Sequence, residues 1–378
     1  MMKKLFRLSV MLLSALLMGI CTACENNGPD LPGSGDEPLM PANPNAPYRG
    51  FYLLNEGVWG SNKATLDYFD YTTGLYANDV FAKNNPAIVG QLGDNGVDIQ
   101  QYGGKIYVLL NGSNLVEIMD AHTAKHITAV EIPNVRSVCF AEGKAYFSSY
   151  AGKLLPTGVQ EGYVVEMDTL TFALERTAPV GRQPEGLAVY NDKLYVANSG
   201  GYTADNYDNT ISVIDMATFQ PVDTIEVAIN LQYLFFATDG TLYVSSRGNY
   251  VDIKPSVCLV DVATRTIKKV LDCNMSSVSV VKNNAYVMDF SYGATSVRFW
   301  TIDLQKQELS EAAFGSKIAA HNILYPYALA VHPVTGDVLV TDAVDFVTPG
   351  MLYYFDAQGN LLWKKIAGDI PGHILFLH

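Results

Sequence analysis

The sequence lacks the features that mark several familiar classes of protein. Basic residues are scarce, since 25 lysines and arginines stand against 38 acidic residues and the formal charge is −13. Such a chain repels the phosphates of nucleic acid and of anionic lipid, so neither is an expected partner. Cysteine is also rare, and beyond residue 24 only Cys139, Cys258 and Cys273 remain. Cys139 and Cys258 lie inside apolar alternations, which favours buried thiols and implies no disulfide framework.

Motifs of common enzyme classes are missing as well. The sequence has no His-Glu-x-x-His zinc motif, no Gly-x-Ser-x-Gly nucleophile elbow, no phosphate-binding P-loop and no dinucleotide-binding glycine motif after a strand. The histidines form no metal-ligand pattern. We therefore expect a protein that is not an enzyme and that carries no cofactor and no metal. Segments with a helical period are almost absent, which predicts an all-β fold.

The first 24 residues are typical of a bacterial lipoprotein precursor. Three basic residues precede an apolar run over residues 8–20, which is too short for a transmembrane helix and predicts a signal peptide over residues 1–23. The stretch "TAC" that ends at Cys24 resembles a lipobox, which implies lipidation of Cys24. Residues 24–49 are rich in Pro, Gly, Asn and Asp and predict a flexible tether. The acidic stretch after Cys24 resembles the export signal of Bacteroidetes surface lipoproteins. We expect a cell-surface protein of the outer membrane, held by its lipid anchor alone.

What the sequence does contain is one unit repeated seven times over residues 50–378. Each unit after the first has four short alternating apolar segments, bounded by Gly, Asn and Asp, and successive units are 42 to 53 residues apart. Each unit also has an apolar run that ends in an aspartate. These aspartates are Asp70, Asp120, Asp168, Asp215, Asp261, Asp303 and Asp356. Period-2 segments between turn residues predict antiparallel strands, and seven units of four strands predict a seven-bladed β-propeller.

The first unit lacks its inner segment, and the end of the chain supplies a candidate for it. The last residues, "GDIPGHILFLH", have the same shape as "VGRQPEGLAVY" in the middle of the chain: Gly, then Pro, then an apolar run. We predict that residues 371–378 form the inner strand of the blade whose other strands begin at Phe51. This pairing would join the two ends of the ring and remove its open edges.

The connections between strands predict two different faces. One face has short turns, including the seven aspartate turns, in which the carboxylate is expected to accept hydrogen bonds from backbone amides. The other face has longer loops rich in Tyr, Trp, Asn and Arg, which suits a large polar ligand. The alternative is that these aromatics only cover blade edges. The candidate ligand-binding residues are Trp59, Asn62, Asn95, Arg136, Tyr150, Glu185, Asn198, Tyr202, Arg247, Tyr250, Tyr292, Tyr327 and Phe346.

Three sequence stretches resemble a known family over nearly all of residues 50–378. They are "FYLLNEGVWGSNKATLDYFD", "QPEGLAVYNDKLYVANSGGY" and "YPYALAVHPVTGDVLVTDA". They are similar to the YncE-like propellers of Bacteroidetes surface lipoproteins, and most of all to the corrinoid-binding BtuG-type members. The resemblance implies a seven-bladed propeller that captures cobalamin or related corrinoids and delivers them to a TonB-dependent cobalamin transporter. The family's binding residues are not matched one by one, so the candidate residues rest on loop position.

Other functions remain open at this point. The loop-rich face could bind a glycan or a peptide, because glycan platforms also use Trp and Tyr. The protein could be a scaffold within an envelope complex. A metal-dependent, lactonase-like hydrolase is a further alternative, since carboxylates near the upper ends of several strands could approach the axis. These carboxylates belong to Glu56, Asp98, Glu185, Asp289 and Asp342.

Overall fold

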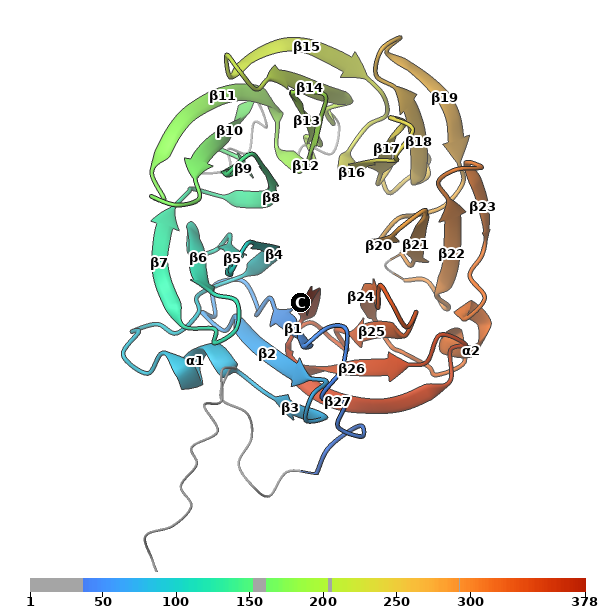
Figure 1. Cartoon of the computed structure of the whole chain (residues 1–378). Helices are drawn as coiled ribbons and strands as arrows, with labels where there is room; N and C mark the ends of the chain where they lie inside the picture. Colours follow the sequence, from blue (N-terminus) through green and yellow to red (C-terminus); the bar gives the residue numbers. More distant parts are fainter. Residues whose placement is uncertain (1–36, 152–160, 203–205, 292) are drawn as a thin grey trace, which may run out of the picture.

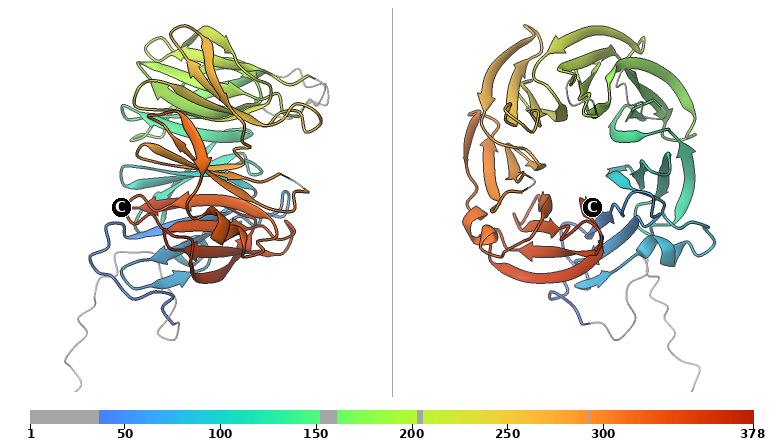
Figure 2. Two further views of the ribbon diagram at one scale, coloured as in Figure 1. Left: turned by 90° about the vertical axis from the view of Figure 1, so that its right-hand side faces the viewer. Right: turned by 180° about the vertical axis from the view of Figure 1, so that it is seen from behind.

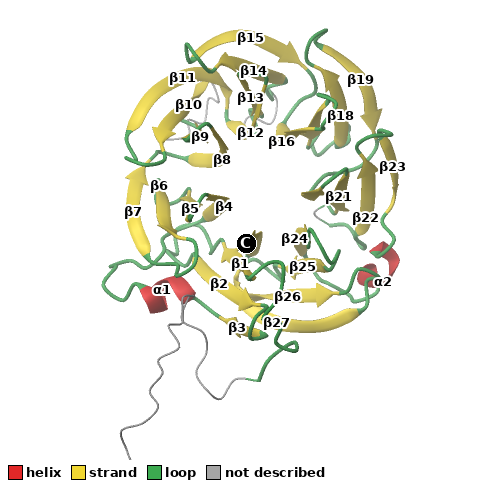
Figure 3. Cartoon of the chain, viewed as in Figure 1, coloured by secondary structure: helices red, strands yellow, loops and turns green. Residues whose placement is uncertain are grey.

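The computed structural model describes residues 37–151, 161–202, 206–291 and 293–378. Within them, seven four-stranded antiparallel sheets are arranged around a central axis (Figures 1 and 3). This arrangement confirms the predicted seven-bladed propeller. The described residues also contain two five-residue helices, α1 (Val80–Asn84) and α2 (Gly315–Ala319), both at the periphery of the ring (Figure 3).

Each blade is numbered here from the N-terminus, and its strands are given from the axis outward. Blade 1 contains β28 (Pro371–Leu377), β1 (Gly50–Asn55), β2 (Thr65–Asp70) and β3 (Leu75–Ala77). Blade 2 contains β4 (Gly96–Tyr102), β5 (Lys105–Leu110), β6 (Leu115–Asp120) and β7 (His126–Glu131). Blade 3 contains β8 (Val135–Ala141), β9 (Lys144–Ser149), β10 (Glu161–Asp168) and β11 (Leu174–Arg182). Blade 4 contains β12 (Pro184–Tyr190), β13 (Lys193–Asn198), β14 (Thr210–Asp215) and β15 (Gln220–Glu226).

The remaining three blades follow the same plan. Blade 5 contains β16 (Leu231–Phe236), β17 (Leu242–Ser246), β18 (Ser256–Asp261) and β19 (Thr266–Leu271). Blade 6 contains β20 (Ser277–Val281), β21 (Asn284–Asp289), β22 (Arg298–Asp303) and β23 (Glu308–Glu311). Blade 7 contains β24 (Pro326–Val331), β25 (Val338–Asp342), β26 (Pro349–Phe355) and β27 (Leu361–Asp369).

The core lies between neighbouring blades, and the sequence pattern explains why. The second strand of each blade is almost entirely buried because both of its faces meet a neighbouring sheet, whereas the outer strand β7 alternates between half-buried and exposed residues. Between blades 3 and 4, Tyr146 and Val164 pack against Leu187 and Val196. Apolar burial of this kind is the main favourable term in folding, and it recurs at the other blade junctions.

The C-terminal strand closes the ring, as predicted. Strand β28 pairs antiparallel with β1, and the register sets Phe51 opposite Phe376 and Leu53 opposite Ile374. Leu377 at its end is fully buried. Blade 1 therefore contains strands from both ends of the propeller. Blade 7 packs against it, which closes the ring.

The seven aspartate turns lie on one face, which we call the lower face. The C-terminus, marked in Figure 2, lies on the same face, because Gly50 pairs with both Asp70 and Leu377. In every one of the aspartate turns, a carboxylate oxygen accepts at least one backbone N–H within the turn. Asp215 Oδ1, for example, accepts from Thr218 N and Oγ1, each at 3.0 Å. This confirms the structural role predicted for these residues. The opposite, upper face carries the longer loops and the first residues of the inner strands.

Part of the expected tether packs against the propeller. Leu39 N donates to Gly74 O at 2.8 Å, and Arg49 N donates to Leu377 O at 2.9 Å. Leu39, Met40, Ala46 and Tyr48 are partly buried against the core between blades 7 and 1. The Pro- and Gly-rich composition indicated a flexible tether up to residue 49. Residues 37–49 nevertheless carry enough apolar side chains to cover the lower edge of blade 1.

Other expectations concern the N-terminus and the cysteines. Cys24 and residues 1–23 lie outside the described residues, so lipidation and the signal peptide stay predictions. No helix in the described part of the chain is long and apolar enough to cross a membrane. Cys258 and Cys273 are buried and Cys139 is partly buried, and none of the three forms a disulfide.

Candidate functional site

Six of the seven inner strands begin with a β-bulge at the upper face. In β8, for example, Val135 and Ser137 pair with neighbouring residues of β9, so Arg136 between them has no partner. A bulge leaves its extra residue outside the ladder and re-aims its side chain. The bulge residues are Val97, Arg136, Glu185, Gly186, Gln232, Tyr233, Tyr327, Ala328 and Gly372. The inner strand of blade 6, β20, pairs without a register shift.

All of these bulge residues line one cavity on the axis. The cavity has a volume of about 610 Å³, within the range of about 300–1,000 Å³ that is usual for small-molecule sites. Its wall also includes Glu56, Asn95, Asp98, Arg247 and His373. Because the inner strands start at the upper face, their first residues place the cavity at the upper end of the axis. The wall is rich in charged and polar side chains.

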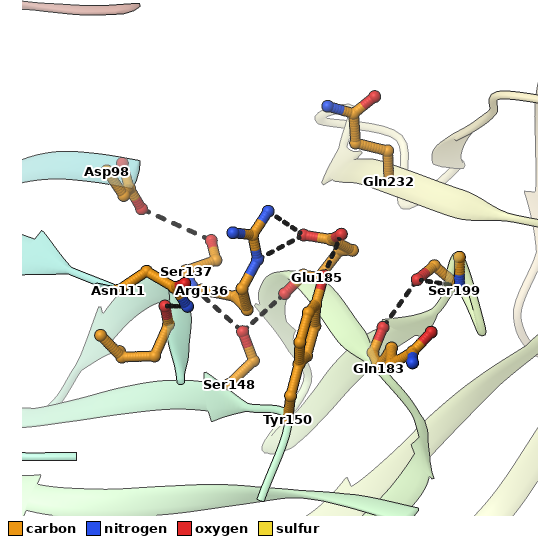
Figure 4. A network of polar contacts seen from close by, with 12 residues as sticks. Asp98, Asn111, Arg136, Ser137, Ser148, Tyr150, Gln183, Glu185, Ser199 and Gln232 are labelled. Atoms are coloured by element: carbon orange, nitrogen blue, oxygen red, sulfur yellow. Dashed lines mark hydrogen bonds and ion pairs between the residues drawn. The ribbon is translucent and has the colours of Figure 1, made fainter. Parts of the chain in front are cut away.

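Hydroxyl groups from the second strands fix the geometry of the bulges. Ser148 Oγ accepts the N–H of Ser137 at 3.1 Å and donates to Glu185 O in the next blade at 2.7 Å (Figure 4). In the same way, Thr341 Oγ1 accepts Ala328 N at 2.8 Å and donates to Pro371 O at 2.7 Å. These bonds satisfy backbone groups that the bulge removes from the ladder. The cavity wall is therefore rigid before any ligand arrives.

One side of the cavity is a network around Glu185, a buried residue of blade 4. Arg136 Nε and Nη2 each donate to Glu185 Oε2 at 3.2 Å (Figure 4). Arg247 Nη1 donates to Glu185 Oε1 at 3.3 Å. The Tyr150 hydroxyl also donates to Oε1. Burial alone would raise the pKa of Glu185, but the two guanidinium groups and these donors hold it below its usual value. Glu185 is therefore a carboxylate that bridges two arginines from the neighbouring blades.

The opposite side of the cavity is acidic. The Tyr327 hydroxyl donates to Glu56 Oε2 at 3.1 Å, and His373 Nε2 lies 3.3 Å from Glu56 Oε1. Burial, followed by the nearby Glu56 carboxylate, raises the pKa of Tyr327 well above its usual value, so Tyr327 acts as a hydrogen-bond donor. Burial also raises the pKa of Asp98, against the opposing effect of His373. The cavity thus has a basic wall on blades 3 to 5 and an acidic wall around blades 1, 2 and 7.

The structure brings part of the predicted set together. Five candidates line the cavity: Asn95, Arg136, Glu185, Arg247 and Tyr327. Two more lie directly behind the wall. The Tyr150 ring lies 5.1 Å from the guanidinium of Arg136, and the Phe346 ring packs 5.6 Å from that of Tyr327.

Three aromatic candidates are exposed on the upper face, with 63% of Trp59, 66% of Tyr202 and 71% of Tyr250 accessible to solvent. The first two are tied to the cavity wall. Asp94, next to the wall residue Asn95, accepts the N–H of Gly60 at 2.8 Å beside Trp59. The Tyr202 ring meets the Tyr150 ring edge-on at 5.9 Å.

The other candidates do not reach the cavity. Asn198 is fully buried and donates to Thr210 Oγ1 at 3.0 Å and Ser212 Oγ at 2.9 Å, so it supports the loop that follows. Asn62 donates to Gly90 O at 3.0 Å and lies in the Trp59 loop. Tyr292 lies outside the described residues.

Of the five carboxylates named for the hydrolase alternative, some line the cavity and others do not. Glu56, Asp98 and Glu185 line the cavity, whereas Asp289 is bound by Arg298 and Trp300 and does not line it. Asp342 accepts the backbone N–H groups of residues 324 and 325. Within the described residues, no group of three His, Cys, Asp or Glu could hold a metal ion.

Loop position missed several polar wall residues, among them Gln232 and His373. Gln232 Oε1 accepts Arg247 Nε at 2.9 Å, so it orients one of the two arginines. The sequence does contain a spacing pattern that indicates the bulges from which such residues reach the cavity. The buried residues Leu231 and Leu234 are three apart where strict alternation would make them two or four apart, and Val135 and Val138 repeat this spacing.

Fold and site together define a seven-bladed propeller with a preformed, charged cavity at one end of its axis. Residues 49–368 match the family described as "Domain of unknown function (DUF5074)", and the chain belongs to this family. No curated protein matches the chain.

Solved structures share the fold at low identity. A quinonprotein alcohol dehydrogenase-like protein from Bacteroides thetaiotaomicron is 16% identical, with a TM-score of 0.61 over 87% of this chain and 78% of that one. A functionally unknown protein from Desulfotomaculum acetoxidans is 14% identical, with a TM-score of 0.60 over 87% and 99%. Hydrazine synthase from Kuenenia stuttgartiensis is 16% identical, with a TM-score of 0.54 over 68% and 74%. At these identities the likeness concerns the fold alone.

Proposed function

We propose that the protein is a non-enzymatic surface receptor that binds cobalamin or a related corrinoid at its upper face. In this proposal it is held in the outer membrane by a lipid on Cys24 and delivers its ligand to a TonB-dependent transporter. The observation that carries the proposal is the rigid polar cavity at the upper end of the axis, with exposed aromatic residues on the same face. The resemblance to YncE-like corrinoid-binding lipoproteins supplies the ligand class.

The dimensions of the site suggest how such a ligand would lie. A corrinoid is larger than a cavity of about 610 Å³, so the corrin ring would lie across the mouth and only part of its periphery would enter. Trp59, Tyr202 and Tyr250 offer exposed ring surface for the broad ligand, since aromatic side chains provide much contact area at little entropic cost. Asn95 and Gln232 offer amide groups that complement the amides of the corrin edge.

The chemistry of Glu185 also favours binding over catalysis on the basic wall. Glu185 already accepts hydrogen bonds from two arginines and a tyrosine, and these keep its carboxylate ionised and occupied. A general base needs a carboxylate with a pKa near the working pH, whereas the pKa of Glu185 is lowered. The same arrangement suits a rigid recognition site, because its donors hold fixed positions.

Calorimetry with cyanocobalamin and the full-length protein in detergent micelles tests the proposal. We expect Trp59→Ala and Tyr202→Ala each to weaken binding by about 2 kcal/mol, roughly thirtyfold, as for other exposed aromatic anchors. Leu170→Ala is the matched control, since Leu170 is 79% exposed in an aspartate turn on the lower face. The absence of cyanocobalamin binding by the wild-type protein would end the corrinoid proposal. Binding of a neutral glycan instead would favour the glycan alternative.

A further inference from the structure

We infer that the Arg136–Arg247 pair is a subsite for a singly charged oxyanion, and that it takes the phosphodiester of the ligand. This inference rests on the proposed corrinoid function for the identity of the ligand. It depends on three features of the basic wall: its unused donors, its charge, and the acidic wall that faces it.

The two arginines retain donors that no described residue occupies. Arg136 uses Nε and Nη2 on Glu185, while Arg247 uses Nε on Gln232 and Nη1 on Glu185. A guanidinium has five N–H donors, so each arginine keeps three that have no acceptor among the described residues. Both side chains line the cavity and are mostly buried, at 20% and 24% exposure. Donors in such a position need an acceptor from water or from a ligand.

The positive charge on this wall is also only partly neutralised. One carboxylate, on Glu185, serves two guanidinium groups, so the three side chains together keep one positive charge. An excess charge in a partly desolvated site is costly unless a counter-charge joins it. A monoanion would complete the neutralisation. Arginine forks match the oxygens of phosphate and carboxylate groups, and hydrogen bonds between two charged groups are the strong ones.

The facing wall limits the charge that the ligand group can carry. Glu56 lies across the same cavity, and Asp98 lies beside the basic wall, where it accepts the N–H of Val138 at 3.2 Å, so a second negative charge would approach both carboxyl groups. A phosphate monoester or a diphosphate is therefore disfavoured, while a phosphodiester carries one charge shared between two oxygens. In cobalamin, the phosphodiester of the nucleotide loop is the one group of this kind, because the side chains on the corrin edge end in neutral amides.

A comparison of two corrinoids on the full-length protein tests the inference. Cyanocobalamin has the phosphodiester, whereas dicyanocobinamide keeps the corrin ring and its amides but lacks the nucleotide loop. We expect the wild-type protein to bind cyanocobalamin roughly tenfold more tightly or better, as for the loss of one charge-assisted hydrogen bond. Arg247→Gln should weaken cyanocobalamin binding and leave dicyanocobinamide binding nearly unchanged.

Substitution of Glu185 should act in the opposite direction. Glu185→Gln keeps the shape of the side chain and removes its negative charge, so the net positive charge of the wall rises by one and cyanocobalamin should bind more tightly. General damage to the site would weaken binding in both variants, so the opposite signs separate the charge effect from a structural one. Arg265→Gln is the matched control, since Arg265 pairs with Asp223 at 2.7 Å in the region of an aspartate turn on the lower face.

A competition with the wild-type protein needs no variant. Dimethyl phosphate, at an ionic strength held constant with sodium chloride, should displace cyanocobalamin and have little effect on dicyanocobinamide. Equal affinity for the two corrinoids, or equal effects of the substitutions on both, would overturn the phosphodiester subsite and leave the receptor function standing. If neither corrinoid binds the wild-type protein, both the receptor function and the subsite assigned to it fail.

Discussion

Deleting residues 371–378 should prevent the propeller from forming, because this segment is the inner strand of blade 1. The strand buries Leu377 completely and packs Ile374, Leu375 and Phe376 against the clusters on either side of the blade. Truncating one buried apolar side chain costs about 2–5 kcal/mol. The loss of one fully buried and three partly buried apolar side chains, together with the pairing to β1, is comparable to the whole stability of a typical domain, about 5–15 kcal/mol.

Circular dichroism and thermal unfolding measure this effect, and a point substitution gives a graded version of it. Leu377→Ala should lower the free energy of unfolding by about 3 kcal/mol. With an unfolding entropy of about 2.1 cal/mol/K per residue over roughly 330 residues, this corresponds to a fall in the melting temperature of about 4 °C. Leu362→Ala on the outer strand β27 is the control, because Leu362 is half exposed and its truncation should cost little. A truncated protein with an unchanged spectrum and melting temperature would refute the closure of the ring by β28.

Two further predictions concern the anchor and a buried carboxyl group. Cys24→Ala should release the protein from the outer membrane fraction and abolish labelling by palmitate, and a variant that stays membrane-bound and labelled would exclude Cys24 as the anchor. Burial raises the pKa of Glu117 to about 7, against the hydrogen bond and charge of His126, whose Nδ1 lies 2.6 Å away. The folded protein thus holds this proton more tightly than the unfolded chain does, and the stabilisation is lost as the pH rises towards 7. The wild type should therefore lose stability between pH 5 and 7.5, whereas Glu117→Gln should not. The melting temperature of the variant minus that of the wild type should rise with pH, and a pH-independent difference would contradict this linkage.

The architecture could be predicted because its determinants are local and repeated. The alternation of apolar residues sets the strands, and each aspartate bonds amides within its own turn, as at Asp215. The closing strand could be recognised because Pro371 and the apolar run after it copy the start of β12. The segment over residues 37–49 was harder to predict, since its composition is that of a tether while its few apolar residues find a surface on blade 1.

The site could be predicted only in part because loop position does not fix side-chain direction. Asn198 is the last residue of the second strand of blade 4 and Arg247 follows the second strand of blade 5, yet Asn198 turns inward to hydroxyl groups and Arg247 turns to the axis. Asn198 is held by Thr210 and Ser212 of its own blade, whereas Arg247 reaches Glu185 of the neighbouring blade, and a single sequence does not reveal such partners. The partnership of Arg136 with Glu185 joins residues 49 positions apart, and it exists because two bulges face each other across a blade junction.

Because of the repeated bulge, the side chains that line the axis are independent of the strand pairing that holds the ring together. A residue such as Gln232 or Tyr327 has no partner in its ladder, so its replacement changes the wall without changing the register of any strand. The propeller therefore behaves as a frame with a small set of interchangeable positions around its axis. Ligand preference could be rewritten at those positions by libraries that leave the hydrophobic junctions between blades untouched.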